Sequence, residues 1–279
     1  MNQQLFTPAP DPDVVQAPLG RFTAVASGKG GVGKTWFSIT LAHALARLGC
    51  RVLLFDADFG LANIDIQLGL NPQHDIGSAL SGHAPLLAAV TPYEPGGFDI
   101  IAGRSGSGAL SSLPASIVDA LLQALVVVAQ PYDVVLLDLG AGLHPQVRQV
   151  AAWADTLLVI ATEDPTSVTD AYATLKLHAA DCPRRDARIV VNQASNATAG
   201  KRTAATLVQA CQAFLRQTPG FAGVVRRDQH VQDAIRRQTS LLTRYPNSPS
   251  GTDVERIAAR LWPSLTAICP APSVHAHAR

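Results

Sequence analysis

Short apolar runs alternate along the chain with longer segments in which apolar residues recur at helical spacing. The runs are continuously apolar rather than alternating, a pattern typical of strands covered on both faces of a sheet. They predict strands over residues 22–26, 51–55, 99–102, 134–137, 156–161, 188–192 and 221–225. The longer segments predict helices over residues 34–48, 114–129, 165–180 and 198–217. This alternation predicts an α/β fold with a doubly wound, mostly parallel sheet and helices on both faces.

The same pattern predicts a single domain over residues 21–268. Residues 1–20 contain several prolines and no apolar run, so we expect a flexible arm and not a signal peptide. Residues 269–279 are expected to form a loose tail. The domain is predicted to end in an amphipathic helix over residues 252–268, with an apolar stripe of Val254, Ile257, Ala258, Leu261, Leu265 and Ile268. The stripe fits a membrane-surface helix or a helix packed on the core, and Pro263 interrupts it.

Composition narrows the classes of protein that this chain can represent. The net charge is +1 with 15% charged and 47% hydrophobic residues, so the chain lacks the strong positive charge of a nucleic-acid coat protein. The four cysteines form no CxxC pair, and we expect free thiols in a reducing compartment. No apolar stretch reaches the ~18 residues that a membrane-spanning helix needs. We therefore expect a cytoplasmic protein whose membrane contacts, where they exist, are peripheral.

The strongest chemical signal directly follows the first predicted strand and opens the first predicted helix. This segment consists of Gly28, Lys29, Gly30, Gly31, Val32, Gly33, Lys34 and Thr35. Its glycine spacing fits both a dinucleotide fingerprint, with Asp56 as the ribose-binding acid, and the phosphate loop GxxxxGK[ST]. Lys34 and Thr35 favour the phosphate loop over the dinucleotide fingerprint, because a nucleoside triphosphate needs a cation on its β- and γ-oxygens and a hydroxyl on Mg²⁺.

A second element of the predicted site is acidic. Asp138 follows the apolar run 134–137, and ligands bind at the carboxyl ends of strands in open α/β sheets. We predict that Asp138 holds a water of the magnesium ion, with a helix cap or a loop aspartate as the alternative. The next residues, Gly140, Ala141 and Gly142, predict a flexible segment that responds to the γ-phosphate.

Lys29 is not part of the general template, and together with two further motifs it carries a family resemblance. The loop resembles the deviant Walker A motif K-G-G-x-x-K-[ST] of the MinD/ParA family of P-loop ATPases. Residues 56–65 read DADFGLANID, and residues 163–172 read EDPTSVTDAY. Both resemble motifs of the MinD branch, most closely its flagellar-number regulators FlhG/FleN. The resemblance extends from about Ala24 to about Leu242.

The resemblance implies a Mg²⁺-dependent ATPase that forms a homodimer when ATP is bound. Lys34 would bind the phosphates of its own nucleotide, and Lys29 would reach across the dimer to the partner's nucleotide. Asp58 would orient the attacking water, which implies slow hydrolysis. Asp56 would lie beside the metal-bound water or simply stabilise its turn. Asn192 would contact adenine through its amide.

The resemblance also implies partners. These are an FlhF-type GTPase, a flagellar transcription activator or a switch-complex protein, with peripheral membrane contact at the inner face of the plasma membrane or the cell pole. The segment DQAxxLR that stimulates the GTPase is missing from the first residues of this chain. The alternatives are a ParA-like DNA-partitioning ATPase, which would use clusters such as Arg226, Arg227, Arg236 and Arg237, and a nucleotide-sensing adaptor with negligible turnover. DNA is the less favoured partner. A kinase or ligase on the same fold is less favoured still.

Overall fold

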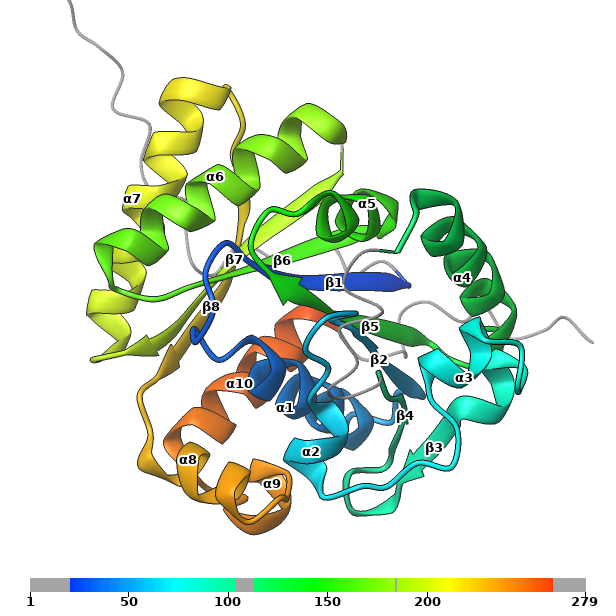
Figure 1. Ribbon diagram of the computed structural model, residues 1–279. Coiled ribbons are helices and arrows are strands. Elements are labelled where there is room, and N and C mark those ends of the chain that lie inside the picture. Colours follow the sequence, from blue (N-terminus) through cyan, green and yellow to red (C-terminus); the bar gives the residue numbers. More distant parts are fainter. Residues whose placement is uncertain (1–20, 104–112, 184, 263–279) are drawn as a thin grey trace, which may run out of the picture.

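The computed structural model describes residues 21–103, 113–183 and 185–262, and it contains one eight-stranded sheet in the order β3-β4-β2-β5-β1-β6-β7-β8 (Figure 1). All neighbouring strands are parallel except β3 and β4, which are antiparallel. The strands are β1 (Phe22–Ser27), β2 (Val52–Ala57), β3 (Val90–Tyr93), β4 (Phe98–Ile101), β5 (Val134–Ala141), β6 (Thr156–Ala161), β7 (Asp186–Ala194) and β8 (Gly220–Arg226). The predicted mostly parallel sheet is therefore confirmed.

Helices cover both faces of this sheet (Figure 1). On one face lie α4 (Ala115–Val128), α5 (Pro145–Trp153), α6 (Pro165–Asp181) and α7 (Ala197–Leu215), and α3 (Ile76–Leu80) packs into the same apolar cluster. On the other face lie α1 (Lys34–Arg47), α2 (Ile64–Leu68), α8 (Gln229–Arg236), α9 (Leu241–Arg244) and α10 (Pro249–Leu261). Two 3-10 helices, η1 (Leu86–Ala89) and η2 (Glu94–Gly96), flank β3. The doubly wound arrangement is the one that the sequence predicts.

Strand β5 shows why the apolar runs do not alternate. Its side chains point to opposite faces in turn, so Val135 and Leu137 enter the cluster under α4 to α7, and Val134 and Leu136 enter the cluster under α1 and α10. All four are fully buried. Burying each such side chain contributes about 1.5–3 kcal/mol relative to exposure. Both faces of the strand must therefore be apolar.

Several boundaries differ from the prediction. β5 continues to Ala141, so Asp138, Gly140 and Ala141 lie within the strand. The sequence predicts instead that Asp138 lies at the end of the strand and that residues 140–142 form a flexible segment. The extension follows from pairing, because β5 is hydrogen-bonded to β1 on one side and to β2 on the other. Of the predicted flexible segment, only Gly142 has a left-handed backbone, with φ of 94°.

The sequence pattern misses β3 and the short helices α2, α3, α8 and α9. β3 is an edge strand that contains Pro92, and proline is tolerated there because one side of an edge strand makes no ladder hydrogen bonds. The short helices carry too few turns for a helical period to be visible in the sequence.

The last described helix corrects the predicted bounds 252–268. α10 begins at Pro249 and ends at Leu261, and Trp262 leaves the helical conformation, with φ of −129° and ψ of 78°, as expected of a residue that precedes a proline. Val254, Ile257, Ala258 and Leu261 are buried against the sheet and α1. This part of the apolar stripe therefore packs on the core. Leu265 and Ile268, together with the predicted arm 1–20 and tail 269–279, lie outside the described residues.

A buried histidine on α1 makes stability depend on pH. Burial, followed by the charge of Arg47, lowers the pKa of His43 to about 4, and its Nδ1 lies 2.7 Å from the Ser240 hydroxyl. A depressed pKa means that the unfolded chain binds the proton more readily. We expect up to about 3 kcal/mol of stability to be lost as the pH falls from 6.5 to 4. Urea denaturation of the wild type and of His43→Gln tests this, because glutamine does not titrate; equal pH slopes in the two proteins would contradict it.

Candidate functional site

The predicted phosphate loop connects β1 to α1 at the carboxyl edge of the sheet. Gly31 and Gly33 have φ of 79° and 84°, a left-handed conformation that favours glycine. Gly33 is the N-cap of α1, and a Cβ on it would come within 2.6 Å of Asn192 Nδ2. The next residues along the chain form the first turn of α1, and the backbone amides of a first helical turn have no partner within the helix. The loop thus has the backbone geometry that binds an anion at a helix N-terminus.

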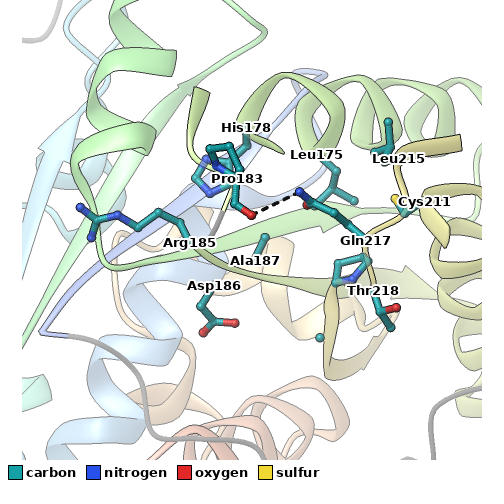
Figure 2. Close-up of a pocket in the computed structure, with 12 residues that line it drawn as sticks. Leu175, His178, Pro183, Arg185, Asp186, Ala187, Cys211, Leu215, Gln217 and Thr218 are labelled. Atoms are coloured by element: carbon teal, nitrogen blue, oxygen red, sulfur yellow. Dashed lines mark hydrogen bonds between the residues drawn. The ribbon is translucent and has the colours of Figure 1, made fainter. Parts of the chain in front are cut away.

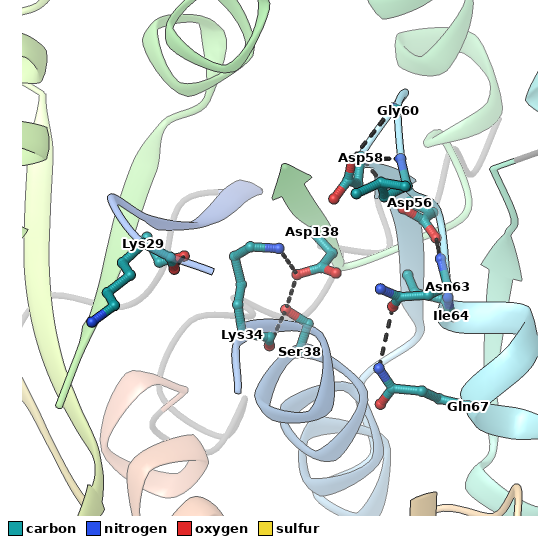
Figure 3. A network of polar contacts seen from close by, with 12 residues as sticks. Lys29, Lys34, Ser38, Asp56, Asp58, Gly60, Asn63, Ile64, Gln67 and Asp138 are labelled. Atoms are coloured by element: carbon teal, nitrogen blue, oxygen red, sulfur yellow. Dashed lines mark hydrogen bonds and ion pairs between the residues drawn. The ribbon is translucent and has the colours of Figure 1, made fainter. Parts of the chain in front are cut away.

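Lys34 and Asp138 meet beneath this loop (Figure 3). Lys34 Nζ lies 3.3 Å from Asp138 Oδ1, and the Ser38 hydroxyl donates to the same oxygen at 2.8 Å. Lys34 is 7% exposed and Asp138 1%. Asp138 Oδ2 is buried and has no hydrogen-bond partner among the residues that the structure describes. A buried carboxylate oxygen without a hydrogen bond is unfavourable. This oxygen is therefore suited to accept a hydrogen bond from a ligand, such as a metal-bound water.

Ser38 is the residue of this cluster that the sequence analysis missed. It lies one turn after Lys34 on α1, and its hydroxyl also hydrogen-bonds the Lys34 carbonyl at 3.1 Å. The signal that could have identified it is the i, i+4 spacing from Lys34, which places both residues on one face of the helix. The predicted metal ligand Thr35 lies in the same first turn and is buried.

Lys29 occupies a different environment. Its Nζ donates to Thr166 Oγ1 at 2.6 Å and lies 3.7 Å from Asp164 Oδ2, and its side chain is 43% exposed. Figure 3 shows it directed away from Lys34 and Asp138. Gly28 packs so closely on α6 that a Cβ would overlap the Asp170 carbonyl. The motif at residues 163–172 thus supports the start of the phosphate loop.

The Asp56 carboxylate is hydrogen-bonded to the backbone of the segment that follows it. Its oxygens accept from the amides of Asp58, Asn63 and Ile64 at 3.0–3.2 Å, which ties the segment before α2 to β2. Burial, followed by the neighbouring Asp138 charge, raises the pKa of Asp56 to about 7. Asp56 pairs with Asp138 across the β2–β5 ladder. These contacts fit a turn-stabilising role, and its place beside a metal-bound water stays a prediction.

Asp58 lies at the rim of the site. Its Oδ1 accepts from the amides of Gly60 and Leu61 at 3.3 and 2.9 Å. It lines a cavity of about 520 Å³ together with Gly140 and Ala141, and Leu61 beside it is 75% exposed. The structure therefore brings Asp58 next to the end of β5, as a residue that orients water near the γ-phosphate requires.

Asn192 contacts the phosphate loop and also lines a cavity beside it. Its Nδ2 donates to the Val32 carbonyl at 2.8 Å, and Gln193 Nε2 donates to the Gly31 carbonyl at 3.2 Å. β7 continues past Asn192 to Ala194. Both amides line a cavity of about 340 Å³ beside the loop. Contact of Asn192 with adenine stays a prediction, because one N–H of its amide is used by the Val32 carbonyl.

Another cavity, of about 240 Å³, lies at the opposite edge of the sheet, where β7 and β8 begin (Figure 2). Its walls include the buried His178 and Cys211, and Gln217 Nε2 reaches the Pro183 carbonyl across it at 3.4 Å. None of the predicted site residues lines it. The candidate site is therefore the carboxyl edge around the phosphate loop.

Residues 23–241 match the family model "CobQ/CobB/MinD/ParA nucleotide binding domain". The chain is 35% identical to "Antiactivator FleN" of Pseudomonas aeruginosa, over 86% of this chain and 86% of that protein. It is 29% identical to "Flagellum site-determining protein YlxH" of Helicobacter pylori, over 88% of this chain and 83% of that protein.

Solved structures agree on the fold. The MinC:MinD cell division complex of Aquifex aeolicus contains a chain with a TM-score of 0.71 and 24% identity, covering 87% of this chain and 95% of that one. MinD complexed with Mg-ADP from Pyrococcus horikoshii gives a TM-score of 0.71 and 18% identity, covering 90% and 99%. A family match over most of the described residues, and a relative 35% identical along most of the chain, show that this protein belongs to the MinD/ParA family of nucleotide-binding proteins.

Proposed function

We propose that the protein is an ATP-gated dimerisation switch that hydrolyses ATP slowly and regulates the number and placement of flagella. The observation that carries the proposal is the contrast between the two loop lysines. Lys34 is buried on Asp138, whereas Lys29 is 43% exposed and, among the described residues, is held by Asp164 and Thr166. A lysine that can leave its surface partners is suited to reach a second nucleotide. The flagellar names of two relatives support the biological setting.

The residues suggest how binding would proceed. Phosphates arriving at the loop attract Lys34, because they offer more negative charge than one carboxylate. Once Lys34 binds the phosphates, Asp138 loses its ion pair, and Asp138, through a water, and the Thr35 hydroxyl would be the residues that hold Mg²⁺. When bound, Mg²⁺ supplies positive charge that stabilises the β- and γ-phosphates. Asp58 would then orient the attacking water, and a group that orients the water without abstracting its proton accounts for slow turnover.

The state of assembly tests the proposal directly. Light scattering on the full chain should give a dimer with ATP and Mg²⁺ and a monomer with ADP. A chain that stays monomeric with ATP contradicts the switch. ATP-dependent dimers without measurable phosphate release would instead favour the adaptor with negligible turnover.

Replacing Lys29 with alanine should separate binding from hydrolysis. Because the polar partners of the Lys29 ammonium in the described part of the chain are the surface residues Asp164 and Thr166, we expect ATP affinity to change by less than about 3-fold. Loss of a cation that stabilises the partner's nucleotide in the transition state should lower kcat at least about 10-fold. Phosphate release and calorimetry measure the two quantities. A proportional loss of both would show that Lys29 serves its own nucleotide.

DNA remains the less favoured partner, because most of the arginines in the predicted basic cluster are paired. Arg226 is bound by Asp253, and Arg236 and Arg237 by Asp233. This pairing reduces the charge available for phosphates of DNA. A gel shift with random DNA at low salt, with ATP, tests it, and tight binding would restore the partitioning alternative.

We propose a cytoplasmic location, with contact to the inner face of the plasma membrane or the cell pole through residues after Trp262. None of the helices in the part of the chain that the structure describes combines the length and apolarity needed to cross a bilayer. An FlhF-type GTPase, a flagellar transcription activator or a switch-complex protein is the proposed partner. Co-sedimentation with anionic liposomes, compared between ATP and ADP, tests the membrane contact. Equal pelleting of wild type and Leu265→Asp would contradict it.

A further inference from the structure

In the part of the chain that the structure describes, the Asp138 carboxylate receives its hydrogen bonds on one oxygen (Figure 3). Lys34 Nζ lies 3.3 Å from Oδ1, and the Ser38 hydroxyl donates to the same oxygen at 2.8 Å. Both donors come from α1. Asp56, the register partner of Asp138 on β2, accepts from backbone amides of the segment that follows it. Asp138 therefore depends on α1 for its hydrogen bonds.

The two donors on α1 differ in what they can do when a nucleotide binds. Lys34 is the cation that the proposed mechanism moves to the phosphates. Ser38 is neutral and fully buried one turn further along the helix, so it stays on Asp138 when a ligand arrives. Its one proton has two acceptors, Asp138 Oδ1 and, at 3.1 Å, the Lys34 carbonyl. Because hydrogen bonds to a carboxylate are stronger than those to a carbonyl, we expect the proton on Asp138 once Lys34 has left.

Without Ser38, the transfer of Lys34 from Asp138 to the phosphates would leave a buried carboxylate with neither an ion pair nor a hydrogen bond. Asp138 is 1% exposed, so bulk water cannot supply the missing donors. A buried acceptor without a partner carries the full cost of desolvation, which is larger for a charged group. The Ser38 hydrogen bond lowers this cost in the bound state. The affinity of the loop for phosphates thus depends on a side chain that does not touch them.

We infer that Ser38 is a positioning residue for phosphate binding: its hydroxyl holds Asp138 while Lys34 moves to the phosphates. This inference rests on the proposed binding of ATP at the phosphate loop. The effect of Ser38 passes through the charge of Asp138, because the hydroxyl contacts that carboxylate and its own helix. The effects of removing Ser38 and of removing the charge should therefore not be additive.

Calorimetric titration of the full chain with ATP in EDTA tests this, because hydrolysis needs Mg²⁺ and the metal cannot provide Asp138 with a new donor. We expect Ser38→Ala to weaken ATP binding about 10-fold. In the Asp138→Asn background, where no charge is left to compensate, the same substitution should change the affinity by less than about 2-fold. Ser38→Cys should weaken ATP binding as Ser38→Ala does, since a thiol fills the same site and is only a weak donor.

Thr40→Val is the matched control. Thr40 is also fully buried on α1, and its hydroxyl donates at 2.8 Å to the Trp36 carbonyl of the same helix. The substitution removes a buried hydroxyl without touching Asp138, so it should leave the ATP affinity unchanged in both backgrounds. Thermal denaturation verifies that each variant is folded at the assay temperature. Ser38→Cys decides the matter where the alanine variant does not fold.

Equal weakening of ATP binding by Ser38→Ala with and without the Asp138 charge would show that Ser38 only supports the helix, and would overturn the inference. An unchanged ATP affinity in a folded Ser38→Ala or Ser38→Cys variant would overturn it as well. In both cases wild-type ATP binding stands, so the proposed function is unaffected.

The wild-type chain separates the two proposals further. If it binds ATP with Mg²⁺ but not in EDTA, Lys34 does not leave Asp138 for the phosphates alone, and this inference is overturned while the proposed function stands. If it binds ATP under neither condition, the proposed function is overturned together with this inference.

Discussion

Lys34→Ala is expected to lower the affinity for ATP about 100-fold or more. In the structure Lys34 is the buried cation of the loop, and a bound triphosphate would take over the interaction that Asp138 now makes at 3.3 Å. Removing one partner of a buried, hydrogen-bonded charge pair typically costs about 2–5 kcal/mol, and about 2.7 kcal/mol corresponds to 100-fold in affinity. Calorimetry with ATP and Mg²⁺ measures the loss.

The same substitution has a second consequence that needs a control. Without Lys34, Asp138 keeps only the Ser38 hydroxyl at 2.8 Å, and an uncompensated buried carboxylate destabilises the fold. Thermal denaturation must therefore show that the variant is folded at the assay temperature. Lys34→Ala combined with Asp138→Asn removes both charges and should recover stability without recovering ATP binding. Lys201→Ala, on the exposed face of α7, should change neither. Full ATP affinity in a folded Lys34→Ala variant would refute the assigned role.

Much of this site could be predicted because its chemistry is local in the sequence. The residues from Gly28 to Thr35 specify loop, helix start and phosphate ligands in one uninterrupted segment. Asp138 was found because a carboxylate after an apolar run in a parallel sheet lies at the binding edge. The sequence does not predict that Asp138 lies inside the strand, because pairing with β1 and β2 extends β5 to Ala141.

Contacts between distant segments were beyond sequence reasoning. Lys29 meets Asp164 and Thr166 only because β1 and β6 are neighbours, which no local pattern reveals. Asn192 has the residue type of a base contact, yet its amide supports the Val32 carbonyl, and only the packing of β7 against the loop shows this. Strand order and ion pairing therefore determine which side chains remain free for a ligand.

Replacing Asp58 with alanine should slow ATP hydrolysis about 100-fold and leave the dimer loaded with ATP. A side chain that positions a reacting group contributes roughly 100-fold or more to the rate. The Asp58 carboxylate accepts from the Gly60 and Leu61 amides, whereas Lys34 and Ser38 donate to Asp138, so the phosphate and metal contacts should persist. Phosphate release in single turnover measures the rate, and light scattering after removal of free ATP measures how long the dimer lasts.

Alanine also removes the acceptor for the Gly60 and Leu61 amides, which could change the turn itself. Asp58→Asn separates the two effects, because the asparagine oxygen can still accept from both amides while the negative charge is gone. If the charge orients the attacking water, both variants hydrolyse slowly and both give long-lived dimers. If Asp58 only shapes the turn, Asp58→Asn hydrolyses ATP at the wild-type rate and only the alanine variant is slow. The second result would remove Asp58 from the hydrolytic site and leave the carboxylate as a structural element of the segment between β2 and α2.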